Sequence, residues 1–281
     1  MRGWKPRTRM LVYAVVFLLG FVITIYPLVS RLYYRVESKG EIEAFEREKV
    51  ELVDEEVLRR MELAKAYNET LDPSKIGDPY TRKHQEGIAE YARMLELREK
   101  IGHVEIPKID EDIPIYAGTS EFVLQKGAGH LEGTSLPVGG ESTHAVITAH
   151  RGLPTAKLFS DLNKLEVGDR FFIHNIQGVL AYQVDQILTV GPSDFDPVLV
   201  VDGYDYATLL TCTPYMINSH RLLVRGERID YVPAVQEREI AVNREGNLYK
   251  YLFFGTLTLL VLLLLTLLIR RVRRKKKGHS R

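Results

Sequence analysis

Two long apolar runs without a charged residue constrain this chain more than any other feature. The first covers residues 10–30 and the second covers residues 251–269. Each has about 20 residues, and a helix of that length, rising ~1.5 Å per residue, crosses a bilayer core of ~30 Å. The sequence therefore predicts two transmembrane helices. A cleaved signal peptide is the alternative for the first run, but this run is longer than a usual signal core and no small-x-small cleavage site follows it.

The charges of the chain are segregated around these two runs. Residues 1–30 contain four basic side chains and residues 250–281 contain nine, and neither segment contains an acid. All 37 acids therefore lie in 31–249, where they outnumber the remaining 25 basic residues and give a charge of about −12. Basic tails, 1–9 and 270–281, flank the outer ends of the runs, and positive flanks stay in the cytoplasm. We expect two cytoplasmic termini, a C-terminal tail near lipid headgroups, and a single extracellular domain.

Along the middle of the chain, the sequence pattern changes from one that predicts helices to one that predicts strands. In the N-terminal region, 31–101, residues 37–67 and 84–99 repeat apolar side chains every three or four positions, which predicts helices. Residues 71–80 contain two Asp-Pro pairs and a glycine, so an irregular segment separates them. Residues 102–232 alternate short apolar stretches with turn signals, which favours an antiparallel sandwich or a closed barrel. The expected strands are 103–106, 113–116, 145–149, 170–175, 179–190, 207–211 and 221–228, and residues 233–250 are expected to form a linker or short helix.

Cys212 is the only cysteine of the chain. Extracellular domains usually use cysteines in pairs, and a lone cysteine forms neither an internal disulfide nor a Cys-rich zinc site. Cys212 is therefore either an inert buried thiol or a reactive one.

Two further side chains fit a reactive cysteine. Cys212 and His150 each end a predicted strand, and Arg221 begins the next strand, nine residues after the cysteine. The thiolate is the nucleophilic form of cysteine, a nearby histidine can transfer the proton, and a guanidinium can stabilise an oxyanion. Residue types alone leave the alternatives open: a structural thiol, one hydrogen-bonded histidine among several, and a surface arginine.

The motifs around these residues resemble those of the sortase family. Residues 208–214, Thr-Leu-Leu-Thr-Cys-Thr-Pro, are similar to the TLxTC signature, and residues 149–152 resemble the histidine loop. Arg221 lies in a stretch that is similar to the family's arginine motif, His-Arg-Leu-Leu-Val-Arg-Gly. The resemblance covers about 103–230, with all three motifs in the family's order.

This resemblance implies the fold and the roles of the residues. The fold is mainly β, an eight-stranded sortase barrel with N-terminal helices, flanked here by the two predicted transmembrane helices. By position, Cys212 is the nucleophile, His150 the general acid and base, and Arg221 the stabiliser of oxyanion and substrate. Thr208 and Thr211, which share the strand of the cysteine, are candidate substrate-binding residues.

Two features resemble class C, the pilus-polymerising sortases. One is the second apolar run after the barrel. The other is Asp78-Pro79-Tyr80 in the 71–80 segment, which resembles the Asp-Pro-aromatic lid of that class. The lid places its acid toward the arginine and its ring over the cysteine. The family more often has Phe or Trp at the third position, so the hydroxyl of Tyr80 is a departure. An ordinary loop with proline turns is the alternative.

The resemblance implies a thiol transpeptidase at the plasma membrane of a Gram-positive bacterium. It would cleave an LPxTG-like sorting signal through a thioester and join pilins through a lysine isopeptide bond. The alternatives are a sortase that anchors proteins to the cell wall through a peptidoglycan-precursor amine, and a non-enzymatic membrane-tethered binding module. We expect pilin subunits and membrane lipid as partners, and neither a cofactor, a metal nor a nucleic acid.

Overall fold

The computed structural model describes residues 6–71, 76, 79–80, 90–242, 255–256 and 259. The chain divides into two compact units, Met1–Tyr231 and Val232–Arg281. In the second unit, residues 233–242 are helical. Apart from residues 255, 256 and 259, the predicted span 251–269 lies outside the described residues, as does the tail 270–281. Within the described part of the chain, no helix has both the length and the apolar character needed to cross a bilayer.

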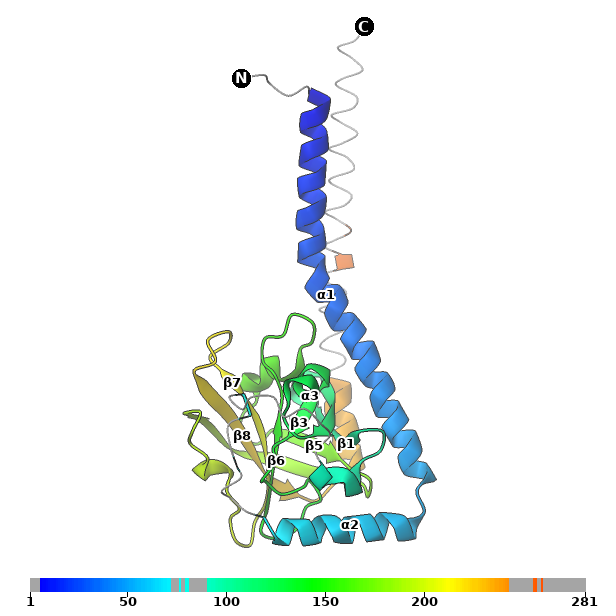
Figure 1. Cartoon of the computed structure of the whole chain (residues 1–281), viewed down its shortest axis with the longest axis vertical. Coiled ribbons are helices and arrows are strands. Elements are labelled where there is room, and N and C mark those ends of the chain that lie inside the picture. Colours follow the sequence, from blue (N-terminus) through cyan, green and yellow to red (C-terminus); the bar gives the residue numbers. More distant parts are fainter. Residues whose placement is uncertain are drawn as a thin grey trace. The chain divides into compact units, whose positions relative to one another are not determined.

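Two helices open the first unit (Figure 1). α1 spans Pro6–Glu51 and α2 spans Asp54–Glu69. The predicted helix over 37–67 is therefore wrong as a single element, because its first half continues α1 and the chain breaks before α2. At this break Val53 has extended backbone, and the acidic first turn of α2 complements the positive end of its helix dipole. The helix predicted at 84–99 is also wrong where the chain is described, since only a short 3-10 helix, η2 at Glu90–Leu95, forms there.

Eight strands follow and close into a barrel, which confirms the predicted barrel architecture. They are β1 (Lys100–Ile106), β2 (Glu111–Ala117), β3 (Ala128–His130), β4 (Thr143–Thr148), β5 (Arg170–His174), β6 (Val179–Val190), β7 (Asp205–Thr213) and β8 (His220–Ile229). Their order around the barrel is β1-β2-β3-β4-β7-β8-β6-β5. Short helices lie in the connections: η3 (Pro107–Ile109), α3 (Glu121–Lys126), η4 (Leu158–Lys164) and η5 (Asp196–Val198).

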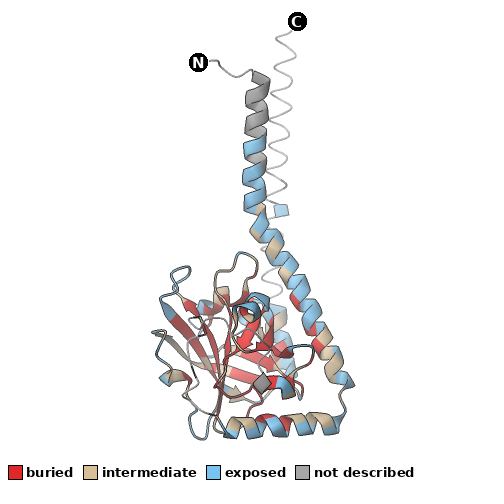
Figure 2. Ribbon diagram, in the orientation of Figure 1, coloured by how far each residue is buried: buried red, intermediate tan, exposed pale blue. Residues whose placement is uncertain are grey.

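The core lies inside the barrel, where buried residues concentrate on the strands (Figure 2). A second, smaller apolar cluster comprises Leu131, Val146, Val198, Leu210 and Leu223, and Ile76 and Tyr80 pack against it. These two residues belong to the 71–80 segment. Ile76 and Tyr80 therefore cover apolar surface of β4, β7 and β8, the strands that carry or precede the expected catalytic residues.

Charged contacts connect the second half of α1 to the barrel. Arg35 pairs with Asp110 at 3.4 Å, Glu41 pairs with the buried Lys100, and Glu46 lies 3.2 Å from Nε2 of His103. Burial alone would lower the pKa of His103, but its hydrogen bonds with Asp112 and Glu46 raise that pKa to about 9. In the absence of a metal, His103 is therefore a buried cation between two carboxylates.

Candidate active site

Strand register brings Cys212 and Arg221 together. Cys212 is the second-last residue of β7 and pairs with Arg221 of the antiparallel strand β8. Side chains of directly paired residues project from the same face of a sheet, about 4.5–5.5 Å apart at Cβ. Both side chains are largely buried, with 5% of Cys212 and 6% of Arg221 exposed. The thiol and the guanidinium are therefore neighbours at one end of the barrel.

His150 reaches the same place through a parallel pairing. β4 pairs with β7, with Thr148 opposite Leu210, and the N–H of Ala149 then donates to the carbonyl of Leu210 at 3.2 Å. Continuing this register by two residues sets His150 level with Cys212. The structure thus brings the predicted histidine, cysteine and arginine to the adjoining ends of three neighbouring strands.

The ring of Tyr80 lies between these residues. The Arg221 guanidinium carbon is 5.1 Å from the centre of the ring, and the His150 ring is 5.7 Å from it, centre to centre. Burial raises the pKa of Tyr80 above its ordinary value, and the adjacent Cys212 raises it further. Tyr80 therefore keeps its phenolic proton, and its ring covers the site.

The hydroxyl of Tyr80 fixes the ring in this position. It donates to the carbonyl of Ala149 at 2.7 Å and lies 2.9 Å from the hydroxyl of Thr148. The departure from Phe or Trp therefore adds two contacts to β4. The predicted facing of Asp78 toward Arg221 lies outside the described residues.

Arg221 is a buried charge with several compensating contacts. Its Nη1 donates to the carbonyls of Asn218 and His220 at 2.9 and 3.0 Å. The face of the Tyr80 ring adds a cation–π interaction, which strengthens when water is excluded. These contacts hold the guanidinium beside the thiol.

Sequence reasoning did not identify Glu121 and Arg151. Nε2 of His150 lies 3.3 Å from Glu121 at the start of α3. Arg151 donates to the hydroxyl of Thr213 at 3.0 Å and to Asn163 at 2.8 Å. It thereby ties the residue after His150 to the residue after Cys212. The position of Arg151 beside His150 was a signal in the sequence, whereas nothing local indicated Glu121.

Thr208 and Thr211, the predicted substrate-binding residues, lie on β7 beside Cys212. Both side chains are buried, with 1% and 0% exposed. The Thr208 hydroxyl lies 2.7 Å from Nε2 of His144, and the Thr211 hydroxyl donates to the carbonyl of Ala149 at 2.8 Å. Both hydroxyls therefore bond within the barrel, where they support β4 and β7.

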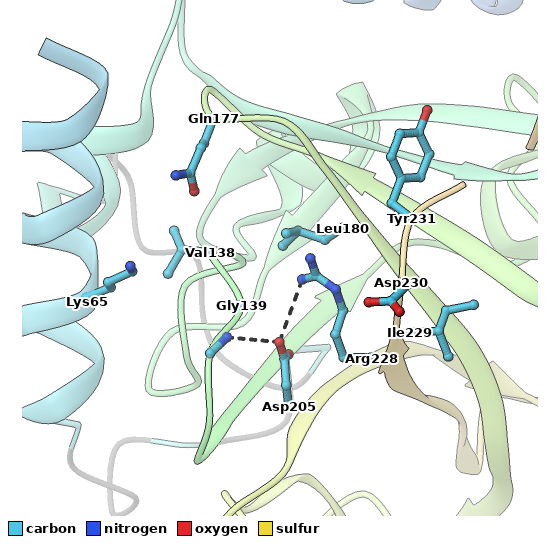
Figure 3. A pocket seen from close by; sticks show the side chains of 11 residues that line it. Lys65, Val138, Gly139, Gln177, Leu180, Asp205, Arg228, Ile229, Asp230 and Tyr231 are labelled. Carbon is cyan, nitrogen blue, oxygen red and sulfur yellow. Dashed lines mark hydrogen bonds and ion pairs between the residues drawn. The ribbon is translucent and has the colours of Figure 1, made fainter. Parts of the chain in front are cut away.

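A cavity of about 800 Å³ is lined by a different set of residues (Figure 3). Its wall includes Lys65 of α2, Asp205 at the start of β7 and Arg228 on β8, and Asp205 and Arg228 pair across it at 3.6 Å. Cys212 is seven residues further along β7, or ~23 Å at ~3.3 Å per residue. This cavity is therefore not the site of the predicted chemistry.

The similarities to known proteins agree with this geometry. A family model described as "Sortase domain" matches residues 104–229. The crystal structure of sortase C-1 from Streptococcus pneumoniae is 62% identical, with a TM-score of 0.67, and covers 69% of this chain and 100% of its own. This chain belongs to the sortase family. The structure of a pilus-related sortase C of Group B Streptococcus is 60% identical, with a TM-score of 0.65, over 67% of this chain and 97% of its own.

A more distant relative is similar over a larger part of this chain. "Sortase A" of Bacillus anthracis is 26% identical over 219 residues, which are 78% of this chain and 95% of the relative. The high identity to the sortase C structures places this sortase in class C. It is a cysteine transpeptidase, which excludes the non-enzymatic binding module.

Proposed function

We propose that this sortase polymerises pilins, by cleaving an LPxTG-like signal of one subunit and joining its new carboxyl end to a lysine of the next. The observation that carries the proposal is the meeting of His150, Cys212 and Arg221 at one barrel end under the ring of Tyr80. The similarity to the pilus-related sortase C of Group B Streptococcus supports the choice of pilin as substrate.

In the first half of the reaction, Sγ of Cys212 attacks the threonine carbonyl of the Thr–Gly bond. The carbonyl oxygen gains negative charge, and the adjacent Arg221 guanidinium stabilises it. The Thr–Gly C–N bond breaks, His150 gives a proton to the departing glycine amine, and a thioester remains on Cys212.

In the second half, the lysine amine of the next pilin attacks the thioester. His150 accepts the proton that this amine loses, an amide bond forms, and the Cys212 thiolate leaves. One peptide bond is broken and one isopeptide bond is formed, so the reaction needs neither an oxidant nor a nucleotide. Glu121, 3.3 Å from the histidine ring, and Arg151 are positioning residues for this cycle.

The lid has to open before substrate reaches the thiol. Tyr80 and Ile76 lie on the apolar cluster beside β4, β7 and β8, and Tyr80 borders both Arg221 and His150. A sorting signal with apolar residues before its threonine would replace the ring on this surface. Competition with the closed lid lowers the apparent affinity by the fraction of enzyme that is open.

The enzyme would act on the outer face of the plasma membrane. The charge-free runs at 10–30 and 251–269, with basic flanks, are the basis for this part of the proposal. Along α1, many exposed side chains are large and apolar: Val15, Val16, Leu19, Phe21, Val22, Ile23, Tyr26, Leu28, Val29, Leu32, Tyr33 and Val36. Such a helix surface is favourable in lipid and costly in water.

The test uses the full-length enzyme in detergent and a purified pilin that carries an LPxTG-like signal. Wild type is expected to form a covalent ladder, and mass spectrometry is expected to find a threonine-to-lysine isopeptide. Cys212→Ala, checked for folding by circular dichroism, is expected to form none.

Two results would contradict the proposal. A ladder with Cys212→Ala would refute the nucleophile. Release of the signal with transfer only to an added peptidoglycan-precursor amine, and none to lysine, would favour the wall-anchoring alternative.

A further inference from the structure

Outside the active site, three side chains from separate elements converge on one point. Glu46 lies on α1, His103 on β1 and His174 at the end of β5. One potential ligand atom from each lies within 4.8 Å of the other two. The three are far apart in sequence, so their spacing gave no signal of a metal site.

Backbone geometry builds this convergence. His103 and His174 are paired residues of the antiparallel strands β1 and β5, and their rings stack 4.1 Å apart. Gly102 allows the two strands to approach here, because a Cβ at this position would lie 2.1 Å from the carbonyl oxygen of His174. Phe45 closes one side, with its ring 6.3 Å from that of His103.

We propose that Glu46, His103 and His174 bind one zinc ion, which joins α1 to the barrel. In a tetrahedral site with Zn–N and Zn–O distances of ~2.0–2.1 Å, neighbouring ligand atoms are ~3.3 Å apart. Nε2 of His103 and Oε1 of Glu46 are already 3.2 Å apart. Water would complete the coordination, as in other three-ligand zinc sites.

The neighbouring carboxylates have the arrangement that supports metal-binding histidines. Asp112 lies 2.6 Å from Nδ1 of His103, and Glu105 lies 3.5 Å from Nε2 of His174. A carboxylate on one ring nitrogen orients the ring and leaves the other nitrogen for a metal. Three carboxylates around two neutral imidazoles also favour a doubly charged ion.

Ligand chemistry favours zinc over calcium or magnesium. Two imidazoles with one carboxylate suit zinc, whereas calcium and magnesium prefer oxygen ligands. Parallel rings direct their nitrogens along parallel lines, so one ring has to rotate to bind the ion. His174 is suited to this movement, since 12% of its side chain is exposed against 5% for His103.

The first test is titration of the untagged full-length chain, in detergent, after EDTA treatment and buffer exchange. Isothermal titration with ZnCl₂ is expected to show one site. At zinc 100 times above Kd, Tm is expected to rise by about 5–10 °C, because the ion binds only the folded chain. CaCl₂ is expected to have no comparable effect.

Variants assign the site. Glu46→Gln and His174→Asn are each expected to weaken zinc binding at least tenfold and to remove most of the rise in Tm. His220→Asn is the matched control, because His220 is an exposed histidine far from the proposed site. His174 pairs with the first residue of β6, whereas the neighbour of His220 in the chain pairs with the last residue of β6. Equal zinc affinity in wild type and in both ligand variants, or no saturable binding by wild type, would overturn the proposal.

A direct measurement covers the case in which a variant does not fold. X-ray absorption at the zinc edge of the wild-type complex is expected to show nitrogen and oxygen ligands with two imidazole rings. A sulfur ligand at ~2.3 Å would assign the ion to Cys212 instead, and fewer than two imidazoles would also refute the site.

Discussion

The hydroxyl of Tyr80 is expected to control access to Cys212, and Tyr80→Phe isolates its effect. The substitution keeps the ring beside Arg221 and His150 and removes the contacts of the hydroxyl, of which those with Ala149 and Thr148 are 2.7 and 2.9 Å long. The closed lid therefore loses two hydrogen bonds and keeps its apolar packing.

The magnitude follows from what the removal leaves behind. A hydrogen bond contributes a net ~0.5–1.5 kcal/mol, and more is lost where a buried partner is left unsatisfied. Here the carbonyl of Ala149 retains the hydroxyl of Thr211 at 2.8 Å, so it keeps a donor. The closed state should lose about 1–2 kcal/mol, which raises the open fraction about 5–30-fold.

The assay is the rate at which a small neutral thiol reagent modifies Cys212, the only cysteine of the chain. If opening is fast relative to modification, the rate is proportional to the open fraction and should rise about 5–30-fold. Tyr182→Phe is the control, because it removes a buried hydroxyl that donates to Asp205 at 3.0 Å, at the other end of β7. Equal rates in wild type and Tyr80→Phe, or an equal rise in the control, would refute the reasoning.

Three further predictions concern charge and position. Arg221→Lys should lower kcat for a sorting peptide by ~10²–10³, because lysine keeps the positive charge but loses the forked N–H donors of the guanidinium. Near-normal turnover of this variant would contradict the prediction. The pKa of His103 is about 9 in the folded protein and ~6.5 in the unfolded chain. Protonated His103 therefore stabilises the folded protein fully below pH ~6.5, and this stabilisation is lost as the pH rises through about 9. In urea titrations with EDTA, Asp112→Asn should remove much of this loss, which is about 3 kcal/mol, and an unchanged pH profile would refute the prediction. Arg151→Lys should lower kcat with little change in KM, because its bond to Thr213 aligns the histidine loop; normal kcat would make the contact dispensable.

The barrel was largely predictable because its strands are short apolar stretches between strong turn signals. The bounds expected for β6, 179–190, agree with the structure. β3 was missed because it has only three residues, Ala-Gly-His, and its place is set by pairing with β2 and β4. Tertiary pairing, which a local pattern does not contain, decides such a strand.

The N-terminal helices were misjudged for a different reason. Val50 and Val53 continued an apolar period across 37–67, so the sequence predicted one helix. In the structure Val50 and Val53 are 84% and 69% exposed, and the chain breaks at Val53, directly before α2. The apolar repeat is present in the sequence, but in this part of it the apolar side chains stay exposed instead of packing into the core.

The site shows the same division between local and long-range information. His150, Cys212 and Arg221 stand in recognisable motifs, and strand register alone explains why they meet. Glu121 is 29 residues from His150, and only the barrel brings its carboxylate to the ring.

The lid and the catalytic strands share one hydrogen-bonding group, which couples access to alignment. The carbonyl of Ala149 accepts from both Tyr80 and Thr211, and it directly precedes His150. When the lid is closed, Tyr80 and Thr211 of β7 hold this carbonyl together, and their side chains also interact with each other. When the lid opens, the contact from Thr211 remains and preserves the register of His150 with Cys212. We therefore expect the lid to move without disturbing the site that it covers, because the buried Thr211 keeps its hydrogen bond to the end of β4.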